Sequence, residues 1–394
     1  MGDDNKTAWG RAIPFRERII RDFSAIVGID SPSLGEREMA GLLKKMLEAD
    51  GFSVAEDGAA APAGGVCGNL IASLAGDAAL PAVALLAHMD TVGPCAGKKC
   101  VVDGDLLRSD GTTILGGDDA AGIVIALETA RRVREAGIRH GDILIILTIA
   151  EEIGLIGAKH LDWDLVRAAT QSGGLPRFCF VFDSSMPVGA VVAKAPTHKN
   201  VRITVTGRAA HAGIEPERGI SAIAALAEAI GAMPLGRIDI ETTANIGKIE
   251  GGSAQNVVCG KATAWGEARS IDPKKLAAQL SQMRACLDAA CKRRGAVFEF
   301  EEDLRYEGFT LDPDCDILRL LDRAARLCLK KPLELRATGG GSDANVLNGI
   351  GIPTANLPAG MHAVHSTEEY ADLREIDGVT ELMVQVFREL AGGN

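Results

Sequence analysis

The stretch Ala82-Val83-Ala84-Leu85-Leu86-Ala87-His88-Met89-Asp90 contains the pattern that decides the fold. Its first six residues form a short, continuous apolar run, which is typical of a strand that is buried on both faces. Similar runs occur at 143–150 and 178–182, and helical patterns at about 120–135 and 158–169 separate the three runs. Because strand and helix alternate, the sequence predicts an α/β fold with a doubly wound, mainly parallel sheet.

Two helices are expected before this sheet. Apolar residues recur at helical spacing over 13–27, and Pro14 suits a first helical turn. Ser33-Leu34-Gly35-Glu36 has the form of a capping box. This predicts a second helix that begins at Ser33 and runs to about residue 49, before Gly51 ends it.

The pattern changes after Lys194, where apolar and polar residues alternate over 201–206. Alternation indicates a sheet with one face in water. The following segments read in turn as helix, three strands, helix and strand: 220–230, 238–249, 254–258, 261–268, 273–293 and 296–301. Their order resembles a ferredoxin-like unit.

The α/β pattern returns at about residue 309, with a helix expected at 314–329 and a strand at 354–357. We therefore expect residues 195–307 to form a domain inserted into a catalytic domain made of residues 1–194 and 308–394.

Composition excludes several classes of protein. The 394 residues include 42 Lys and Arg against 53 Asp and Glu, a formal net charge of −11, and 47% are hydrophobic, which indicates a globular chain. The acidic balance without a basic run argues against nucleic-acid partners. The apolar run 143–150, interrupted only by Thr148, is far shorter than the roughly 20 residues of a membrane-spanning helix. Residues 1–6 lack the features of a secretory signal, so we expect a soluble protein of the cytoplasm that has no membrane partner.

Ionisable side chains directly follow all three predicted strands. His88 and Asp90 follow the first strand, Glu151 and Glu152 the second, and Asp183 the third. The carboxyl ends of parallel strands meet at one edge of a sheet, where open α/β folds bind ligands. So many charges are costly to bury without a cation, and a metal ion is the natural explanation. None of the nine cysteines has C-x-x-C spacing, so oxygen and imidazole are the expected ligands.

The spacing of these residues suggests how they divide the chemistry. His88 and Asp90 are two residues apart, on one face of an extended chain, which suits a metal-bound imidazole held by a carboxylate. Glu151 and Glu152 would point to opposite sides, so one can bind metal while the other faces the reacting water. The simpler alternatives are a hydrogen-bonded histidine at a strand end and a charge pair before a helix.

Other candidates lie outside the strand ends. Asp118 follows Gly116-Gly117 at the start of a helix, where free N–H groups favour carboxylates, and simple N-capping is the alternative. His211 lies after a strand of the inserted domain, where a loop residue without function is the simpler interpretation. Gly340 and Gly341 belong to a glycine-rich loop whose N–H groups could hold a carboxylate, or which forms a plain turn. The signatures H-E-x-x-H, G-x-S-x-G, G-x-x-x-x-G-K-[ST] and G-x-G-x-x-G are absent from the sequence.

Taken together, these residues resemble the M20 family of di-zinc metallopeptidases, and within it the peptidase T-like group. The resemblance covers almost the whole chain and depends on six motifs in family order, at 86–91, 117–122, 150–154, 183, 211–213 and 365–368. It implies two Zn2+ ions per subunit, with Mn2+ or Co2+ as alternatives. Asp118 would bridge the ions, His88 and Asp183 would complete one site, and Glu152 and His365 would complete the other.

The resemblance also implies roles for further residues. Asp90 would orient the His88 ring, and Glu151 would be the general base. The peptide bond after Asp118 is expected to be cis. The inserted domain would be a lid and a dimerisation unit of a homodimer, with His211 reaching the active site of the partner to stabilise the oxyanion. Asn256 and Arg269 are similar to the family's binders of the substrate carboxylate.

The implied reaction is hydrolysis of the N-terminal peptide bond of short peptides, as in a tripeptide aminopeptidase. A water activated between the two ions would attack the peptide carbonyl, with Glu151 moving the proton. Family members with Asp at the position of Asp183 tend to be aminopeptidases or dipeptidases. Two alternatives remain: a carboxypeptidase or amidase acting on N-acyl amino acids, and a non-catalytic metal- or ligand-binding protein. Residues 24–36 do not resemble peptidase T itself.

Overall fold

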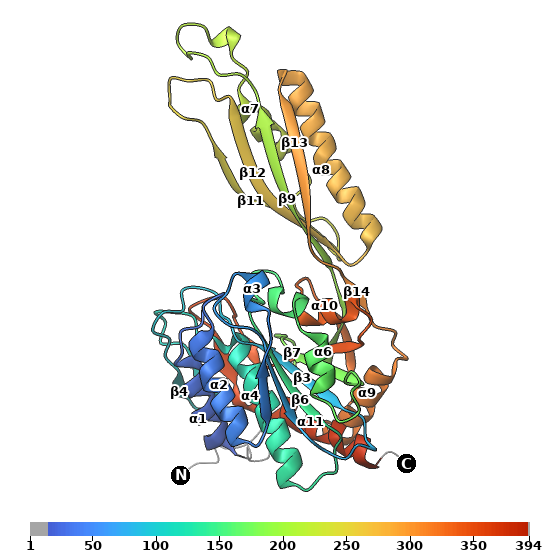
Figure 1. Ribbon diagram of the computed structural model, residues 1–394. Helices are drawn as coiled ribbons and strands as arrows, with labels where there is room; N and C mark the ends of the chain where they lie inside the picture. Colours follow the sequence, from blue (N-terminus) through green and yellow to red (C-terminus); the bar gives the residue numbers. More distant parts are fainter. Residues whose placement is uncertain (1–14, 393–394) are drawn as a thin grey trace. The chain divides into compact units, whose positions relative to one another are not determined.

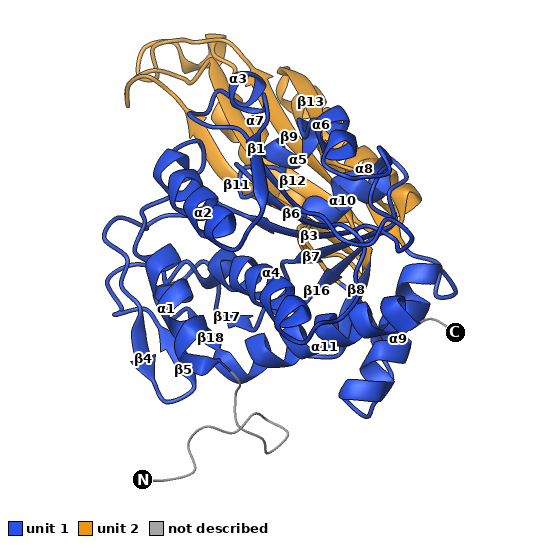
Figure 2. Ribbon diagram, turned by 60° about the horizontal axis from the view of Figure 1, so that its bottom comes forward, with its two compact units in different colours: residues 1–193, 311–337, 342–394 blue, residues 194–310, 338–341 orange. Residues whose placement is uncertain are grey.

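The computed structural model describes residues 15–392, so positions 13 and 14 of the first predicted helix, and residues 1–6, lie outside the described part. The described residues divide into two compact units, shown in Figure 2. Unit 1 comprises residues 15–193, 311–337 and 342–392, and unit 2 comprises 194–310 and 338–341. The predicted insertion, 195–307, lies within unit 2.

A mixed sheet in the order β1-β2-β6-β3-β7-β16-β8 forms the centre of unit 1. Its four central strands run parallel and all their residues are buried: β6 (Ile143–Thr148), β3 (Val83–His88), β7 (Phe178–Phe182) and β16 (Thr354–Leu357). The antiparallel strands at its sides are β1 (Ser53–Glu56), β2 (Leu70–Leu74) and β8 (Ala190–Ala195), and β15 (Glu334–Ala337) also pairs with β8. The predicted α/β class is confirmed, because continuous apolar runs form strands that are covered on both faces.

Helices cover both faces of this sheet. Figure 2 shows α4 (Gly117–Glu135) and α11 (Leu373–Gly392) on one face, and α5 (Ile156–Lys159) and α10 (Asp343–Gly349) on the other. The helix predicted at 158–169 is two short helices, α5 and α6 (Trp163–Ala168), because the Asp162 side chain accepts the N–H groups of Asp164 and Leu165 and starts a new helix. The remaining helices of the unit are α1 (Arg16–Val27), α2 (Arg37–Ala49), α3 (Ala60–Ala63) and α9 (Asp316–Cys328).

The second helix does not begin at Ser33 as the sequence predicts. α2 begins at Arg37, because Leu34 has a left-handed backbone (φ 69°) and residues 32–35 form a turn that is closed by the N–H of Gly35 and the carbonyl oxygen of Pro32. The helix ends at Ala49, and Gly51 (φ 87°) follows with the left-handed conformation that glycine adopts without strain.

A small antiparallel sheet that the sequence does not predict also belongs to unit 1. Its order is β17-β18-β5-β4, with β17 (Met361–His362), β18 (Tyr370–Asp372), β5 (Leu106–Arg108) and β4 (Val101–Asp103). These strands are only two or three residues long, too short for a clear pattern of alternation. Their pairing sets the position of the loop that contains His365.

Unit 2 has the predicted ferredoxin-like arrangement. Its sheet has the order β10-β11-β12-β9-β13, and α7 (Ala222–Ala232) and α8 (Pro273–Arg294) pack on one face of it (Figure 1). The strands are β9 (Thr197–Thr206), β10 (Gly236–Arg237), β11 (Thr242–Gly251), β12 (Lys261–Ser270) and β13 (Val297–Tyr306). Val201, Ile203 and Val205 point into the core, as their alternation predicts. β14 (Phe309–Thr310) pairs with the end of β8 where the chain leaves the unit.

The prediction of a strand at 254–258 is wrong. Only Val257 forms an isolated bridge there, and its partner is His211. Within the described residues, no helix is both long and apolar enough to cross a membrane.

Candidate active site

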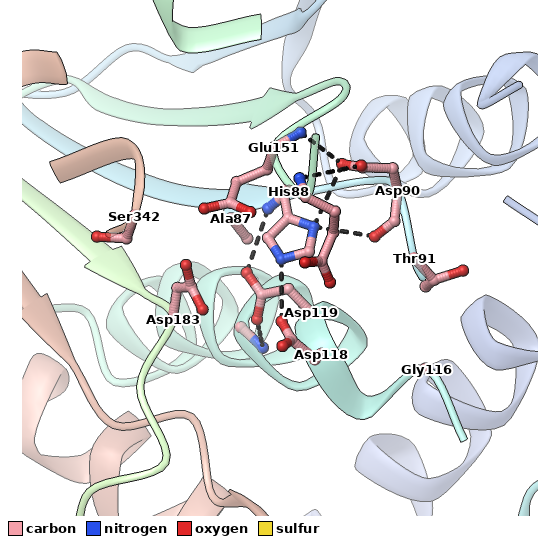
Figure 3. A network of polar contacts seen from close by, with 12 residues as sticks. Ala87, His88, Asp90, Thr91, Gly116, Asp118, Asp119, Glu151, Asp183 and Ser342 are labelled. Carbon is pink, nitrogen blue, oxygen red and sulfur yellow. Dashed lines mark hydrogen bonds and ion pairs between the residues drawn. The ribbon is translucent and has the colours of Figure 1, made fainter. Parts of the chain in front are cut away.

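The carboxyl ends of the central strands bring the predicted residues of unit 1 together. His88 is the last residue of β3, Glu151 and Glu152 follow β6, and Asp183 follows β7. β3 lies between β6 and β7 in the sheet. The chain passes from β3 to β6 on one side and later adds β7 on the other side of β3. This change of direction in the strand order is where open α/β sheets form a ligand-binding crevice. Figure 3 shows the His88 ring between Asp90 and Asp118, with the carboxylates of Glu151 and Asp183 nearby.

Two groups of side chains could each hold a metal ion. Each residue offers one ligand atom, and within a group these atoms lie within 4.8 Å of one another. The groups are His88 with Asp118 and Glu152, and His88 with Glu151 and Asp183. Five of the predicted residues therefore converge on one place in unit 1.

Asp118 lies between two imidazoles. Its Oδ1 is 3.0 Å from Nε2 of His88, and its Oδ2 is 3.3 Å from Nε2 of His365. The same nitrogen of His365 lies 3.0 Å from Oε1 of Glu152. Each oxygen of Asp118 thus faces a different histidine, so this carboxylate could contact two cations at once. The peptide bond between Asp118 and Asp119 is cis, as the resemblance implies.

Asp119 holds the start of α4 against the end of β3. Its Oδ2 accepts the N–H of His88 (3.2 Å), and its Oδ1 accepts the N–H of Gly122 (2.9 Å). A Cβ at Gly122 would lie 2.3 Å from Asp119 Oδ1 and 2.4 Å from the carbonyl oxygen of Phe182, so only glycine fits there. Asp119 therefore links the start of α4 to the end of β3 through its own hydrogen bonds.

Asp90 contacts both the His88 ring and the segment after β6. Nδ1 of His88 lies 2.9 Å from the main-chain carbonyl oxygen of Asp90 and 3.4 Å from its Oδ1. Oδ1 also accepts the N–H of Glu151 (2.9 Å), while Oδ2 accepts the hydroxyl of Ser33 (2.6 Å) and the N–H of Glu152 (3.3 Å). Burial would raise the pKa of Asp90, but the hydrogen bonds with His88 and Ser33 keep that pKa below its usual range. Asp90 is therefore an ionised, fully buried acceptor.

The charges of the cluster are unbalanced without a cation. Burial, together with the charge of Asp183, raises the pKa of Glu151 well above its usual range, and burial does the same for Asp183. Hydrogen bonds with Asp118 and Glu152 raise the pKa of His365 to about 10. A divalent cation would supply the missing positive charge. Carboxylate oxygens and imidazole nitrogens are also ligands that zinc and manganese accept, so the residues present fit such a metal.

Glu369, which the sequence reasoning overlooks, braces the loop before Asp118. It is 1% exposed, and its Oε2 accepts the N–H groups of Leu115 and Gly116, both at 2.8 Å. Its Oε1 accepts the N–H of Asp118 at 3.0 Å. The last of the six motifs ends one residue before Glu369, at Glu368. Positions 118 and 369 are far apart in the sequence, so no local spacing could have predicted their contact.

We expect Glu369→Gln to weaken metal binding by roughly 10- to 100-fold, as is typical when a group behind a metal ligand is changed. The amide would keep the shape of the side chain but place an N–H donor against a backbone N–H. Titration with Zn2+, followed by metal analysis, measures the change. Glu368→Gln, at an exposed neighbour, is the matched control. Equal metal affinity of the two variants would contradict this role of Glu369.

Asp343 is a second buried acid that sequence reasoning does not single out, although it ends the glycine-rich motif. Its Oδ2 accepts the hydroxyl of Thr148 at 2.5 Å, and its Oδ1 has no hydrogen-bond partner among the described residues. Burial raises the pKa of Asp343 to about 6. Unlike Gly340 and Gly341, it belongs to unit 1.

His211 and Asn256 lie together in unit 2. The N–H of Ala212 donates to the carbonyl oxygen of Asn256 at 2.9 Å, and His211 forms its bridge with Val257. The two predicted residues therefore share one pair of loops.

Arg269 and the glycine-rich loop form another group in unit 2. Nη1 of Arg269 lies 3.4 Å from the hydroxyl of Tyr306, and a Cβ at Gly341 would lie 2.3 Å from Cζ of the same ring, so only glycine fits there. The N–H of Gly340 donates to the hydroxyl of Thr338 at 3.2 Å. This N–H thus has a partner within its own loop.

These two groups lie at opposite ends of β9 and β12. The pairing of these strands runs from Lys261 opposite Thr206 to Arg269 opposite His198. Eight residues of strand span about 27 Å, whereas an extended tripeptide spans at most about 11 Å. One tripeptide therefore cannot contact both groups in the same unit.

The chain is similar to several known proteins. Residues 196–295 match the family model M20_dimer, a peptidase dimerisation domain, and residues 69–169 match peptidase family M28. The chain is 40% identical to the uncharacterized protein YqjE of Bacillus subtilis (strain 168) over 375 residues, which cover 95% of this chain and 99% of YqjE.

Two solved structures are similar along the whole chain. One is aminopeptidase PepT from Bacillus cereus ATCC 10987, with 39% identity, a TM-score of 0.84 and coverage of 95% of this chain and 99% of that chain. The other is a tripeptidase from Staphylococcus aureus, with 33% identity, a TM-score of 0.87 and coverage of 96% and 99%.

Proposed function

Because the chain belongs to the M20 family of metallopeptidases, in its peptidase T-like group, we propose that it removes the N-terminal residue from tripeptides and other short peptides. The observation that carries the proposal is the position of Asp118 between His88 and His365, beside the buried Glu151. The two similar solved structures, an aminopeptidase and a tripeptidase, support this substrate class.

We propose that Asp118 would hold two Zn2+ ions, one together with His88 and Asp183 and the other together with Glu152 and His365. Mn2+ and Co2+ are alternatives. The chemistry that such ions would supply when bound is polarisation of the peptide carbonyl and a lower pKa for a water molecule. Glu151 lies close to His88 and Asp183 but is assigned to proton transfer rather than to metal binding.

In this proposal, the residues of unit 1 position the reactants and move one proton. The carboxylate of Glu151 takes a proton from the attacking water and returns it to the leaving nitrogen. The carbonyl oxygen of Asp90 is 2.9 Å from Nδ1 of His88, and its carboxylate accepts the N–H of Glu151, so one buried residue would hold both a ligand and the base.

We further propose a homodimer that forms through unit 2, which is supported by the match of 196–295 to a dimerisation domain. Because His211 and Asn256 lie at the other end of the sheet from Arg269, a tripeptide whose carboxylate is bound by Arg269 and the loop at Gly340 and Gly341 would be too short to reach them in the same unit. His211 would therefore stabilise the oxyanion, and Asn256 would contact the substrate, in the active site of the partner subunit. The location in the cytoplasm remains a prediction from the sequence.

The test compares free tripeptides with the same peptides acetylated at the N-terminus, using metal-loaded protein and product analysis by mass spectrometry. We expect release of the first residue and a dipeptide from the free peptides only. Cleavage of the acetylated peptides alone would contradict the proposal and favour the amidase alternative. Absence of any cleavage would favour the non-catalytic alternative.

A further inference from the structure

The turn at residues 31–36 contacts both strand-end segments that carry the site of unit 1. It holds the segment after β3 through Ser31, whose hydroxyl donates to the carbonyl oxygen of Met89 at 2.7 Å. The carbonyl oxygen of Ser31 accepts the N–H of Thr91 at 2.8 Å. Asp90 is therefore flanked on both sides by residues that are tied to this turn.

The same turn also contacts the side chain of Asp90. The hydroxyl of Ser33 donates to Oδ2 of Asp90 at 2.6 Å, where Asp90 is fully buried. In a capping box the side-chain oxygen of Ser33 would accept a backbone N–H in the first turn of a helix. Here the same hydroxyl donates to the carboxylate of Asp90 instead. The local sequence motif thus has a tertiary partner.

Glu36 connects the turn to the segment after β6. This side chain is fully buried, and its Oε1 accepts the N–H groups of Leu34 (2.8 Å) and Ala150 (3.0 Å). Ala150 has a left-handed backbone (φ 50°), which is uncommon for a residue other than glycine and persists where surrounding contacts hold it. Ala150 directly precedes Glu151, so its backbone conformation sets the direction in which Glu151 leaves the strand end.

We propose that residues 31–36 form a positioning clamp, in which Ser33 holds Asp90 and Glu36 holds Glu151 in the geometry needed for hydrolysis. This inference rests on the proposed function, in which Glu151 is the base. Glu36 is a positioning residue, because its hydrogen bonds go to backbone N–H groups and not to substrate. A purely structural role would instead affect stability without changing kcat.

Two substitutions of Glu36 test the clamp. Glu36→Ala removes the acceptor for the N–H of Ala150, and we expect kcat to fall roughly 10- to 100-fold with KM and metal content almost unchanged. Glu36→Gln keeps an oxygen at the position of Oε1. The amide nitrogen would take the place of Oε2, which has no hydrogen-bond partner among the described residues. This variant should therefore retain a kcat near that of the unmodified protein.

Asp142→Ala is the matched control. Asp142 is also a buried carboxylate that holds backbone groups, because it accepts the N–H groups of Gly76 (3.1 Å) and Gln171 (2.7 Å). It directly precedes β6, at the opposite end of that strand from Glu151. We expect this variant to lose thermal stability without a change in kcat.

Hydrogen exchange of the backbone N–H groups at 150–152 gives a readout that does not depend on activity. Glu36→Ala should speed this exchange, whereas Asp142→Ala should not. An unchanged kcat for Glu36→Ala in an active protein, or a loss in Glu36→Gln equal to that in Glu36→Ala, would overturn the clamp. Unchanged exchange in Glu36→Ala would also overturn it, even if the unmodified protein hydrolysed no peptide and the proposed function had failed.

Discussion

Glu151→Gln is expected to lower kcat by roughly 100- to 10,000-fold, the usual contribution of a positioned proton-transfer group. Glutamine has the size of glutamate but cannot take a proton from water at neutral pH. Asp90 accepts the backbone N–H of Glu151, so the substitution leaves that hydrogen bond intact. KM and metal content should therefore change little. Steady-state kinetics on a free tripeptide and metal analysis of the same preparation measure the three quantities.

Glu135→Gln provides the comparison for this variant. Glu135 lies at the end of α4 and forms an ion pair with Arg18, with no contact to the site in the described part of the chain. Its kcat should equal that of the unmodified protein. Equal activity of both variants would exclude Glu151 as the base. Loss of metal from Glu151→Gln would identify Glu151 as a ligand, since its carboxylate is also close to His88 and Asp183.

Removal of metal by a chelator is expected to abolish hydrolysis and lower the melting temperature. The carboxylates converge at the edge of the unit 1 sheet only in the folded chain, so the metal ion should bind the folded state alone. Such an ion stabilises the folded state by about 2.7 kcal/mol when its free concentration is about 100 times Kd. Zn2+, Mn2+ or Co2+ should restore both properties. Activity assays and thermal unfolding before and after dialysis measure the effect.

Asp118→Asn should remove this response to metal. Asp118 faces both His88 and His365, so an amide nitrogen at either oxygen position would leave one metal site without a ligand. We expect the melting temperature of this variant to stay almost constant when Zn2+ is added. If the unmodified protein kept full activity after its metal had been removed to below the detection limit, the metal-dependent reaction would be contradicted.

The sequence predicts the framework of unit 1 because its central strands have a local signature. The runs at 82–87, 143–150 and 178–182 are apolar except for Thr148, since parallel strands at the centre of an α/β sheet are covered on both faces. The residue after such a strand lies at the carboxyl edge whatever the details of the loops. His88, Glu151 and Asp183 therefore meet at one place, and their convergence could be predicted from order alone.

Local patterns fail where a side chain bonds to a residue far along the chain. Ser33 and Glu36 fit a capping box, yet they contact Asp90 and Ala150, 57 and 114 residues away. Glu369 binds the N–H of Asp118 across 251 residues. A buried carboxylate can accept any N–H group that the fold brings near it, so its partner is not encoded in spacing.

The α/β class, the ferredoxin-like unit and the residue types able to hold a metal can be read from the sequence, because hydrophobic periodicity and strand order depend on neighbours in the chain. Three relations become visible only in the folded chain: Asp118 faces two histidines, Glu369 and Glu36 brace the loops around them, and His211 and Arg269 lie at opposite ends of one sheet. These are relations between distant segments, and hydrogen bonds of about 3 Å require an exact placement that no local pattern specifies.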